Sequence, residues 1–208
     1  MGRKILIEPD ETLYYIVDSN FFANKYLNPH EGSNNEDRDR IRISKEWWII
    51  LDWQIRQKYA IVYVSDLCIA ETFKIIAKKY YQENAFGNNR YQTIRKKITK
   101  DVSVSISRLI SKSRYISYHN FSIDRDIIVG SSRYLEIAHK NNLQSLSVID
   151  LTILSTAKYL IDFFRIKKEQ IIILTGDNKL RKCASLSNDS PSVIDSLKNT
   201  YNNYFTNK

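Results

Sequence analysis

The amino-acid sequence predicts an α/β fold of three layers, α/β/α, with a central and mostly parallel β-sheet. Short runs of consecutive apolar and β-branched residues recur along the chain, which is typical of strands that helices cover on both faces. Segments with helical spacing of apolar residues separate these runs. Strands joined by helices form right-handed crossovers, so we expect a parallel sheet between two helical layers. The 208 residues are enough for one well-packed core, and we expect a single domain over residues 1–208.

The first predicted strand is the run Tyr14–Val17, which stops at Asp18–Asn20, where the residue types favour a turn or a helix cap. A brief helical stretch is expected from Phe21 to Leu27. The segment Asn28–Asp37 is polar and contains Pro and Gly, so it predicts an exposed, mobile loop. We therefore expect an extra loop at about residues 28–43.

A helix and a second strand are expected next. Ser44 is a favourable cap for a helix whose apolar residues recur at helical spacing, namely Trp47, Trp48, Leu51 and Ile55. The run Ala60–Val64 then predicts a second buried strand. Ser65 is expected to begin a further helix that extends to about Gln82.

The second half of the chain continues the alternation. A basic, mostly helical region is expected at about residues 89–114, and Tyr115–Tyr118 predicts a third strand. Two helices follow, from Asp124 to about Lys140 and from a cap at Ser147 to Phe164. Ile171–Leu174 is the clearest strand, because it is continuously apolar.

The charge and the cysteine content limit the classes of function. A net charge of +9 and a pI near 9.4 favour a polyanionic partner. Only Cys68 and Cys183 are present, without the spacing of a zinc site, which suits a reducing cytoplasm. No run has the roughly 20 apolar residues of a membrane span, and the apolar run near the amino terminus is too short for a secretory signal. We therefore expect a cytoplasmic protein without a membrane partner.

Four carboxylates are predicted to meet at one edge of the sheet. Asp18 and Asp177 follow strands directly, and in open α/β sheets the ligand site lies beyond the carboxyl ends of the strands. Glu71 lies two turns into the helix that begins at Ser65, and Asp150 lies in the first turn of another helix. Ionised carboxylates this close together repel one another unless a cation lies between them. All-oxygen ligands suit Mg²⁺ or Mn²⁺, as one ion or as two.

These segments resemble the motif series of PIN-domain nucleases, a family that includes the toxins of VapBC-type toxin-antitoxin pairs. The resemblance rests on four short segments in order, each in its expected strand or helix: Tyr15–Asn20, Ser65–Glu71, Ser147–Ala157 and Leu174–Asp177. It extends from about Tyr14 to Leu186. The common toxin-type members are shorter, and the excess here falls in the 28–43 segment and in the basic region.

The resemblance implies a fold, a site and an activity. The acidic pocket that binds Mg²⁺ or Mn²⁺ would consist of Asp18, Glu71, Asp150 and Asp177, which would also be the catalytic residues. Asn20 and Thr175 match positions that support these acids or contact phosphate. The implied activity is endoribonuclease hydrolysis of RNA, in which a metal-activated water leaves a 5′-phosphate and a 3′-hydroxyl. A separate antitoxin protein is a further partner that the resemblance suggests. Whether the chain also forms a homodimer stays open at this point.

Each motif also has a purely structural interpretation. The segment Asp18–Asn20 could end a strand and cap a helix, and Ser147 with Asp150 has the spacing of a capping box. Asp177 could follow a turn and cap a helix. Glu71 is harder to explain in this way, because its helix is rich in apolar residues and burying an unpaired carboxylate is costly.

The basic region offers a candidate surface for RNA. Tyr91 would stack on a base, while positively charged side chains would contact phosphates, namely Arg95, Lys96, Lys97 and Lys100. An ordinary solvated face of an amphipathic helix explains the same pattern. Both interpretations remain open at this point.

Three other functions compete with a ribonuclease. A haloacid dehalogenase-type phosphatase would need a second Asp two positions after Asp18, where this chain has Asn20. A non-catalytic nucleic-acid-binding or scaffold protein on the same fold is the main alternative, because a fold does not fix a function. A nuclease acting on structured DNA shares the acidic architecture, and RNA is preferred by the resemblance alone.

Overall fold

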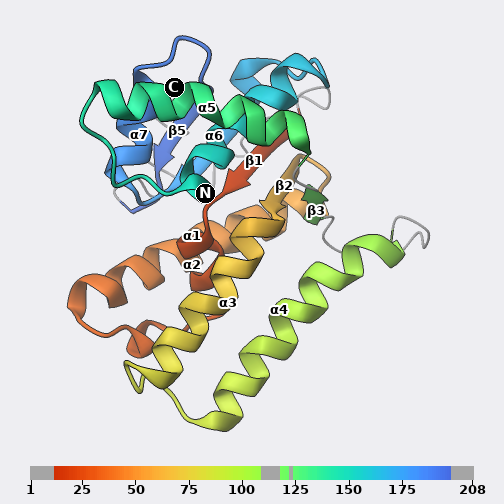
Figure 1. Cartoon of the computed structure of the whole chain (residues 1–208). Coiled ribbons are helices and arrows are strands. Elements are labelled where there is room, and N and C mark those ends of the chain that lie inside the picture. Colours follow the sequence, from red (N-terminus) through yellow and green to blue (C-terminus); the bar gives the residue numbers. More distant parts are fainter. Residues whose placement is uncertain (1–11, 109–117, 122–123, 198–208) are drawn as a thin grey trace, which may run out of the picture.

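A computed structural model describes residues 12–108, 118–121 and 124–197 of the chain (Figure 1). Five strands form one parallel sheet in the order β3-β2-β1-β4-β5. The strands are β1 Leu13–Val17, β2 Ala60–Ser65, β3 Tyr118–Phe121, β4 Ile171–Thr175 and β5 Ser192–Asp195. The α/β fold with a parallel sheet between helices is therefore confirmed.

Burial on both faces explains the two central strands. Tyr15 of β1 pairs in register with Val62 of β2 on one side and with Ile172 of β4 on the other. Every residue of β4 is buried, as its continuously apolar sequence predicts. These strands form the centre of the hydrophobic core, so the residues that follow them are held in fixed positions.

The helices form two layers on the sheet. Right-handed crossovers place the helices between β1 and β3 on one face and the later helices on the other, and Figure 1 shows α1 to α4 apart from α5 to α7. Within the second layer, α5 packs along α6. The helices are α1 Ser19–Asn24, α2 Asn35–Arg56, α3 Asp66–Tyr81, α4 Asn88–Arg108, α5 Arg125–Lys140, α6 Val148–Asp162 and α7 Asn178–Ser185, and two short 3₁₀ helices are η1 Pro29–Glu31 and η2 Lys168–Gln170.

The prediction of an extra loop at about residues 28–43 is wrong. A short 3₁₀ helix occupies Pro29–Glu31, and α2 begins at Asn35 rather than at a cap on Ser44. The side chain of Asn34 caps α2 by accepting a hydrogen bond from the amide of Asp37 at 2.8 Å. The first turns of α2 are polar because they are largely exposed and carry charge pairs four residues apart. The polar first turns of a helix and a polar loop have similar amino-acid composition, so the sequence did not distinguish them.

One further boundary and one strand differ from the sequence prediction, and one predicted helix end lies outside the described residues. The third strand begins at Tyr118, where the prediction had it end, and residues 115–117 lie outside the described residues. The basic region is helical over Asn88–Arg108, and its predicted continuation to residue 114 also lies outside them. The edge strand β5 was not predicted, because it has only four residues and follows Pro191 in a polar segment. Among the residues described, no helix is long and apolar enough to span a membrane.

Candidate functional site

A cavity of about 550 Å³ lies at the carboxyl ends of the central strands. The strand order places β2 on one side of β1 and β4 on the other, so the direction of winding reverses between β1 and β4. Crevices at such a reversal are the usual ligand sites of open α/β sheets. The structure brings all four predicted acids to the lining of this one cavity, namely Asp18, Glu71, Asp150 and Asp177.

Asp18 is the most enclosed of the four acids, with 6% of its surface exposed. Its Oδ1 accepts a hydrogen bond from the amide of Phe21 at 2.6 Å, and its Oδ2 accepts one from the hydroxyl of Thr175 at 2.5 Å. Burial raises the pKa of Asp18 to about 6, against these hydrogen bonds and with a further increase from the charge of Asp150. Thr175 therefore contacts Asp18 directly, as a supporting residue would.

Glu71 reaches the cavity from α3 and is half-buried. The hydroxyl of Ser19 donates a hydrogen bond to Glu71 Oε2. The adjacent Thr72 fixes α3 against α1, because its hydroxyl donates to the carbonyl of Ser19 at 3.2 Å. Ser19 was not among the predicted site residues. Its place between Asp18 and Asn20 was the only signal in the sequence, and that tripeptide also has the composition of a helix cap.

Asp150 and Asp177 cap helices and line the cavity at the same time. Asp150 Oδ2 accepts from the amide and the hydroxyl of Ser147, at 2.8 and 2.7 Å. Asp177 Oδ1 accepts from the amides of Lys179 and Leu180, at 2.6 and 3.3 Å. Each cap uses one oxygen of its carboxylate, so the structural interpretation of these motifs is confirmed without excluding a functional one.

The acids are close enough to affect one another. Burial raises the pKa of Asp150 above its ordinary value, and the negative charges of Asp177 and Glu71 raise it further. Hydrogen bonds from Ser147 oppose this increase. The cavity therefore has a negative potential that favours a proton or a cation.

The fit to a divalent metal is partial. The acids offer oxygen ligands, which suit Mg²⁺ and Mn²⁺. Within the described residues, however, no three side chains of His, Cys, Asp or Glu form a group that could hold a metal ion by themselves. Mg²⁺ usually keeps several waters and takes only one or two carboxylates directly. The cavity therefore fits a hydrated ion better than an ion enclosed by protein ligands.

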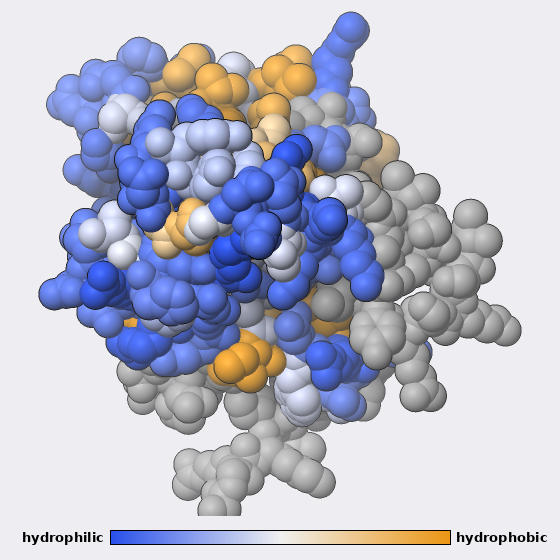
Figure 2. Space-filling view, turned by 90° about the horizontal axis from the view of Figure 1, so that it is seen from below, coloured by the Kyte–Doolittle hydropathy of each residue, from blue (hydrophilic) through white to orange (hydrophobic). Residues whose placement is uncertain are grey.

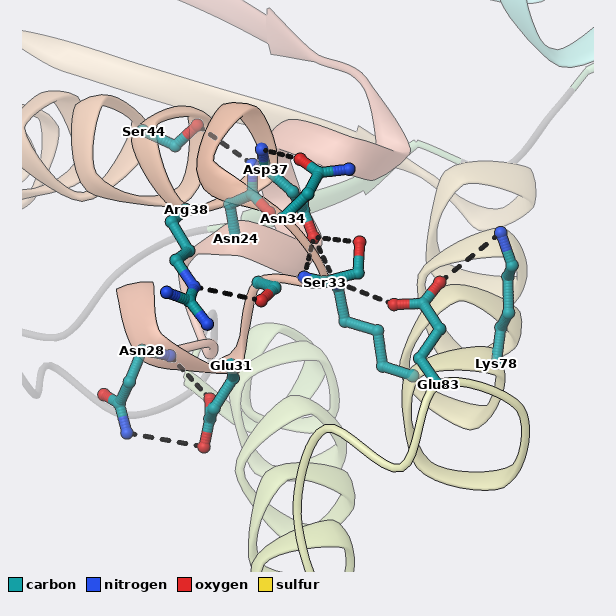
Figure 3. A network of polar contacts seen from close by, with 12 residues as sticks. Asn24, Asn28, Glu31, Ser33, Asn34, Asp37, Arg38, Ser44, Lys78 and Glu83 are labelled. Atoms are coloured by element: carbon teal, nitrogen blue, oxygen red, sulfur yellow. Dashed lines mark hydrogen bonds and ion pairs between the residues drawn. The ribbon is translucent and has the colours of Figure 1, made fainter.

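A further part of the cavity lining comes from α2 and from the part of α3 that follows Glu71. Lys79 is nearly buried, and its Nζ donates to Asp37 at 2.6 Å and to Glu83 at 3.3 Å. Figure 3 shows this network around the first turn of α2, together with the hydrogen bond of 3.1 Å between Asn24 and Ser44. Burial alone would raise the pKa of Asp37, but the bonds from Lys79 and Ser33 hold it below its ordinary value.

Cationic and amide side chains complete the lining. Arg40, Lys79 and Lys179 all line the cavity, as does the exposed side chain of Asn20. The predicted placement of Asn20 near the acids is therefore observed. Arg40 was missed because its segment was predicted to be a loop. Acids and cations in one lining suit a ligand that joins a metal ion to phosphate oxygens.

The basic region does not line this cavity. The prediction that Tyr91 stacks on a base is wrong, because its ring is 8% exposed and stacks on Tyr80 with centroids 4.5 Å apart. Arg95 lies over the same ring, with 5.5 Å between the guanidinium carbon and the centroid. Lys97 and Lys100 line a second cavity, described below, whereas Arg95 and Lys96 are exposed outside it.

The surface seen from below Figure 1 is largely hydrophilic. Figure 2 shows small, separate hydrophobic areas among the hydrophilic residues of that face. The chain matches no family model, no curated protein and no solved structure in the three comparisons. The cavity and its residues are therefore the structural indication of function.

Proposed function

We propose that this protein is a metal-dependent nuclease that hydrolyses RNA phosphodiester bonds in the acidic cavity. The main support is the meeting of four acids, brought from β1, α3, α6 and β4, in one cavity at the reversal of the sheet. Helices that follow parallel strands begin at this edge of the sheet, so capping alone would place Asp18, Asp150 and Asp177 near it. Capping does not explain Glu71, which lies in the second turn of α3 and lines the same cavity. The motif resemblance to PIN-domain nucleases names the same four residues.

A bound Mg²⁺ or Mn²⁺ would supply an activated water and stabilise the charge that develops on the phosphate. Asp150 and Asp177 would hold the ion, because each carboxylate has one oxygen outside its helix cap. Asp18 would accept a proton, or a hydrogen bond from a metal-bound water, in the cavity. Arg40 and Lys179 would orient the phosphate, and Ser19 would fix the carboxylate of Glu71.

The biological role in this proposal is that of a toxin ribonuclease with an antitoxin partner. Only the sequence resemblance supports that role. An antitoxin would bury the acidic cavity and could contact the exposed cations of its lining, Arg40 and Lys179. RNA, rather than DNA, is likewise preferred on the resemblance.

The decisive experiment incubates purified protein with total RNA, with and without Mn²⁺, and maps the ends of the products. We expect cleavage only with the metal, leaving 5′-phosphate and 3′-hydroxyl ends. Asp18→Asn and Asp150→Asn should each lower the rate at least about 100-fold, because even the partners of metal ligands contribute 10- to 100-fold. The amide keeps the size of the side chain and remains a good cap residue, so the fold should persist.

The matched control is Glu136→Gln, which removes the same charge from an exposed position on α5 outside the cavity. It should cleave at the wild-type rate. Full activity in Asp18→Asn or Asp150→Asn would exclude the proposed site. RNA binding with no cleavage under any metal would favour the non-catalytic scaffold instead.

A further inference from the structure

A second cavity, of about 410 Å³, lies between the end of α1, the middle of α2 and the face of α4. Five cationic side chains line it, namely Lys25, Lys45, Arg90, Lys97 and Lys100. The only carboxylate in its lining is that of Asp101. These residues come from three separate parts of the sequence, and only folding brings their charges together.

Two of the cations are neutralised within the protein. Lys25 lies 3.3 Å from Asp101, and Arg90 is held at 2.6 Å by Glu31, whose side chain is almost fully buried. Two nitrogens of the Arg90 guanidinium donate hydrogen bonds to Glu31, Nε to Oε1 at 2.6 Å and Nη2 to Oε2 at 3.1 Å. The guanidinium group is therefore fixed in orientation.

The other three cations lack such partners. No carboxylate of the described chain lies within ion-pair distance of Lys45, Lys97 or Lys100. Partial burial lowers the pKa of Lys45, and the positive charges of Arg90 and Lys97 lower it further, against an opposite effect of Glu31. The three lysines thus share a cavity whose one lining carboxylate, that of Asp101, is already paired with Lys25.

We propose that this second cavity binds a phosphate group. Ammonium groups and an oriented guanidinium are the usual protein ligands of phosphate, and an anion among them would relieve their repulsion. The volume lies within the range of ordinary ligand pockets, so the site has room for a nucleotide as well as for its phosphate. The phosphate comes from an RNA strand or from a free nucleotide, and the experiment below separates these sources.

The second cavity is distinct from the acidic one. Asn24 and Ser44 line the acidic cavity, whereas their neighbours Lys25 and Lys45 line the basic one. The hydrogen-bonded pair of α1 and α2 is therefore a wall with one cavity on each side. Because the two cavities share no lining residue, the phosphate site does not rest on the proposed nuclease activity.

The test measures binding by calorimetry in EDTA, so that metal-dependent cleavage cannot occur. The probes are inorganic phosphate, AMP and a short single-stranded RNA, each titrated into the full chain. The variant Lys97→Gln/Lys100→Gln is compared with Arg95→Gln/Lys96→Gln. Both pairs lie on the exposed side of α4 and remove two positive charges, but only the first pair lines the cavity. Circular dichroism checks that both variants fold. If Lys97→Gln/Lys100→Gln does not fold, Lys45→Gln is measured in its place.

We expect the cavity pair to weaken binding by about tenfold or more, the effect of losing one charge-assisted hydrogen bond. For RNA, the slope of affinity against salt should fall by about 1 for each lysine removed. The control pair should change either quantity much less.

The probes distinguish the two sources of the phosphate. If Lys97→Gln/Lys100→Gln weakens the binding of AMP and of inorganic phosphate, the source is a free nucleotide. If it weakens the binding of RNA alone, the source is an RNA strand. Equal effects of the two pairs on every probe, or no binding of any probe, would overturn the proposal. Because EDTA removes the metal, none of these outcomes depends on cleavage, which separates this result from failure of the nuclease.

Discussion

The acidic and the basic cavity lie on opposite sides of one wall and show two ways of holding like charges together. In the acidic cavity, hydrogen bonds from backbone amides and hydroxyls hold the carboxylates, as at Asp18 and Asp177. In the basic cavity, carboxylates hold Lys25 and Arg90, while three lysines remain without them. Backbone amides hold a charged group in place without neutralising it. An ion pair, in contrast, removes most of the attraction that the charged group has for a ligand. Among the described residues, the charges without an ion pair are therefore the four acids and Lys179 in one cavity, and Lys45, Lys97 and Lys100 in the other.

The largest expected effect is stabilisation by metal. An ion at about 100 times its dissociation constant stabilises a protein that binds it only when folded by about 2.7 kcal/mol, which raises the melting temperature of a domain of this size by about 5–11 °C. We expect this increase with Mn²⁺ or Mg²⁺ in thermal melts of the wild type. Asp18→Asn/Asp150→Asn should lose most of it, while Lys97→Gln/Lys100→Gln should keep it. If neither ion changes the melting temperature of the wild type, the proposed metal site is contradicted.

The next effect concerns the pH dependence of stability without metal. The folded pKa of Asp18 is about 6, above its ordinary value of 3.8, so the folded state binds this proton more tightly than the unfolded state. The contribution of Asp18 to stability should therefore rise as the pH falls through about 6, and reach its full value below about 4. From pH 7.5 to pH 4 we expect wild type to gain about 2–3 kcal/mol relative to Asp18→Asn in urea unfolding. A constant difference between the two proteins would show that Asp18 titrates normally.

A smaller loss is expected when a paired lysine of the basic cavity is removed. Lys25→Met leaves Asp101 without its ion pair and removes the cation 4.9 Å above the ring of Trp48. Because both partners are partly exposed, we expect a loss of about 1–2 kcal/mol, less than for a fully buried pair. Urea unfolding measures it. An unchanged midpoint would show that water replaces the lysine without cost.

The smallest effect is expected at an unpaired lysine of the same cavity. Lys45→Met removes a charge that Arg90 and Lys97 repel, and it breaks no ion pair of the described residues. We expect the free energy of unfolding to stay within about 0.5 kcal/mol of the wild type, with any change toward greater stability. A loss as large as that of Lys25→Met would mean that Lys45 has a structural partner, and would remove the contrast between the two kinds of lysine.

Local signals predicted the main strands and the acids that follow them. Buried central strands must be apolar along their whole length, so β1 and β4 were recognised, and with them Asp18 and Asp177. Ser65 and Ser147 both cap helices in the structure, each by accepting a hydrogen bond from the amide three residues later. These signals lie within a few residues of the feature that they predict, which is why sequence alone located them.

Features that depend on distant partners were not predicted. Lys79 of α3 holds the polar start of α2 through Asp37, and Arg90 of α4 holds η1 through Glu31. Neither contact can be recognised from the local sequence. Tyr91 was assigned to RNA because its neighbours are basic, but its ring is covered by Tyr80 of α3. For the same reason Arg95 to Lys100 could not be divided by sequence into cavity and surface residues. Such a division requires the position of α1 and α2 against α4.

The helix caps formed by the acids also determine how a bound metal ion would exchange in a cell. Asp18, Asp150 and Asp177 are each anchored by amides at the start of a helix, so their positions do not require a metal. In small zinc domains, by contrast, the ion and the fold are lost together. Here an ion would enter a cavity that already exists, and chelation would empty it without unfolding the chain. Activity could then follow the free concentration of the ion over repeated cycles, with the polypeptide intact throughout.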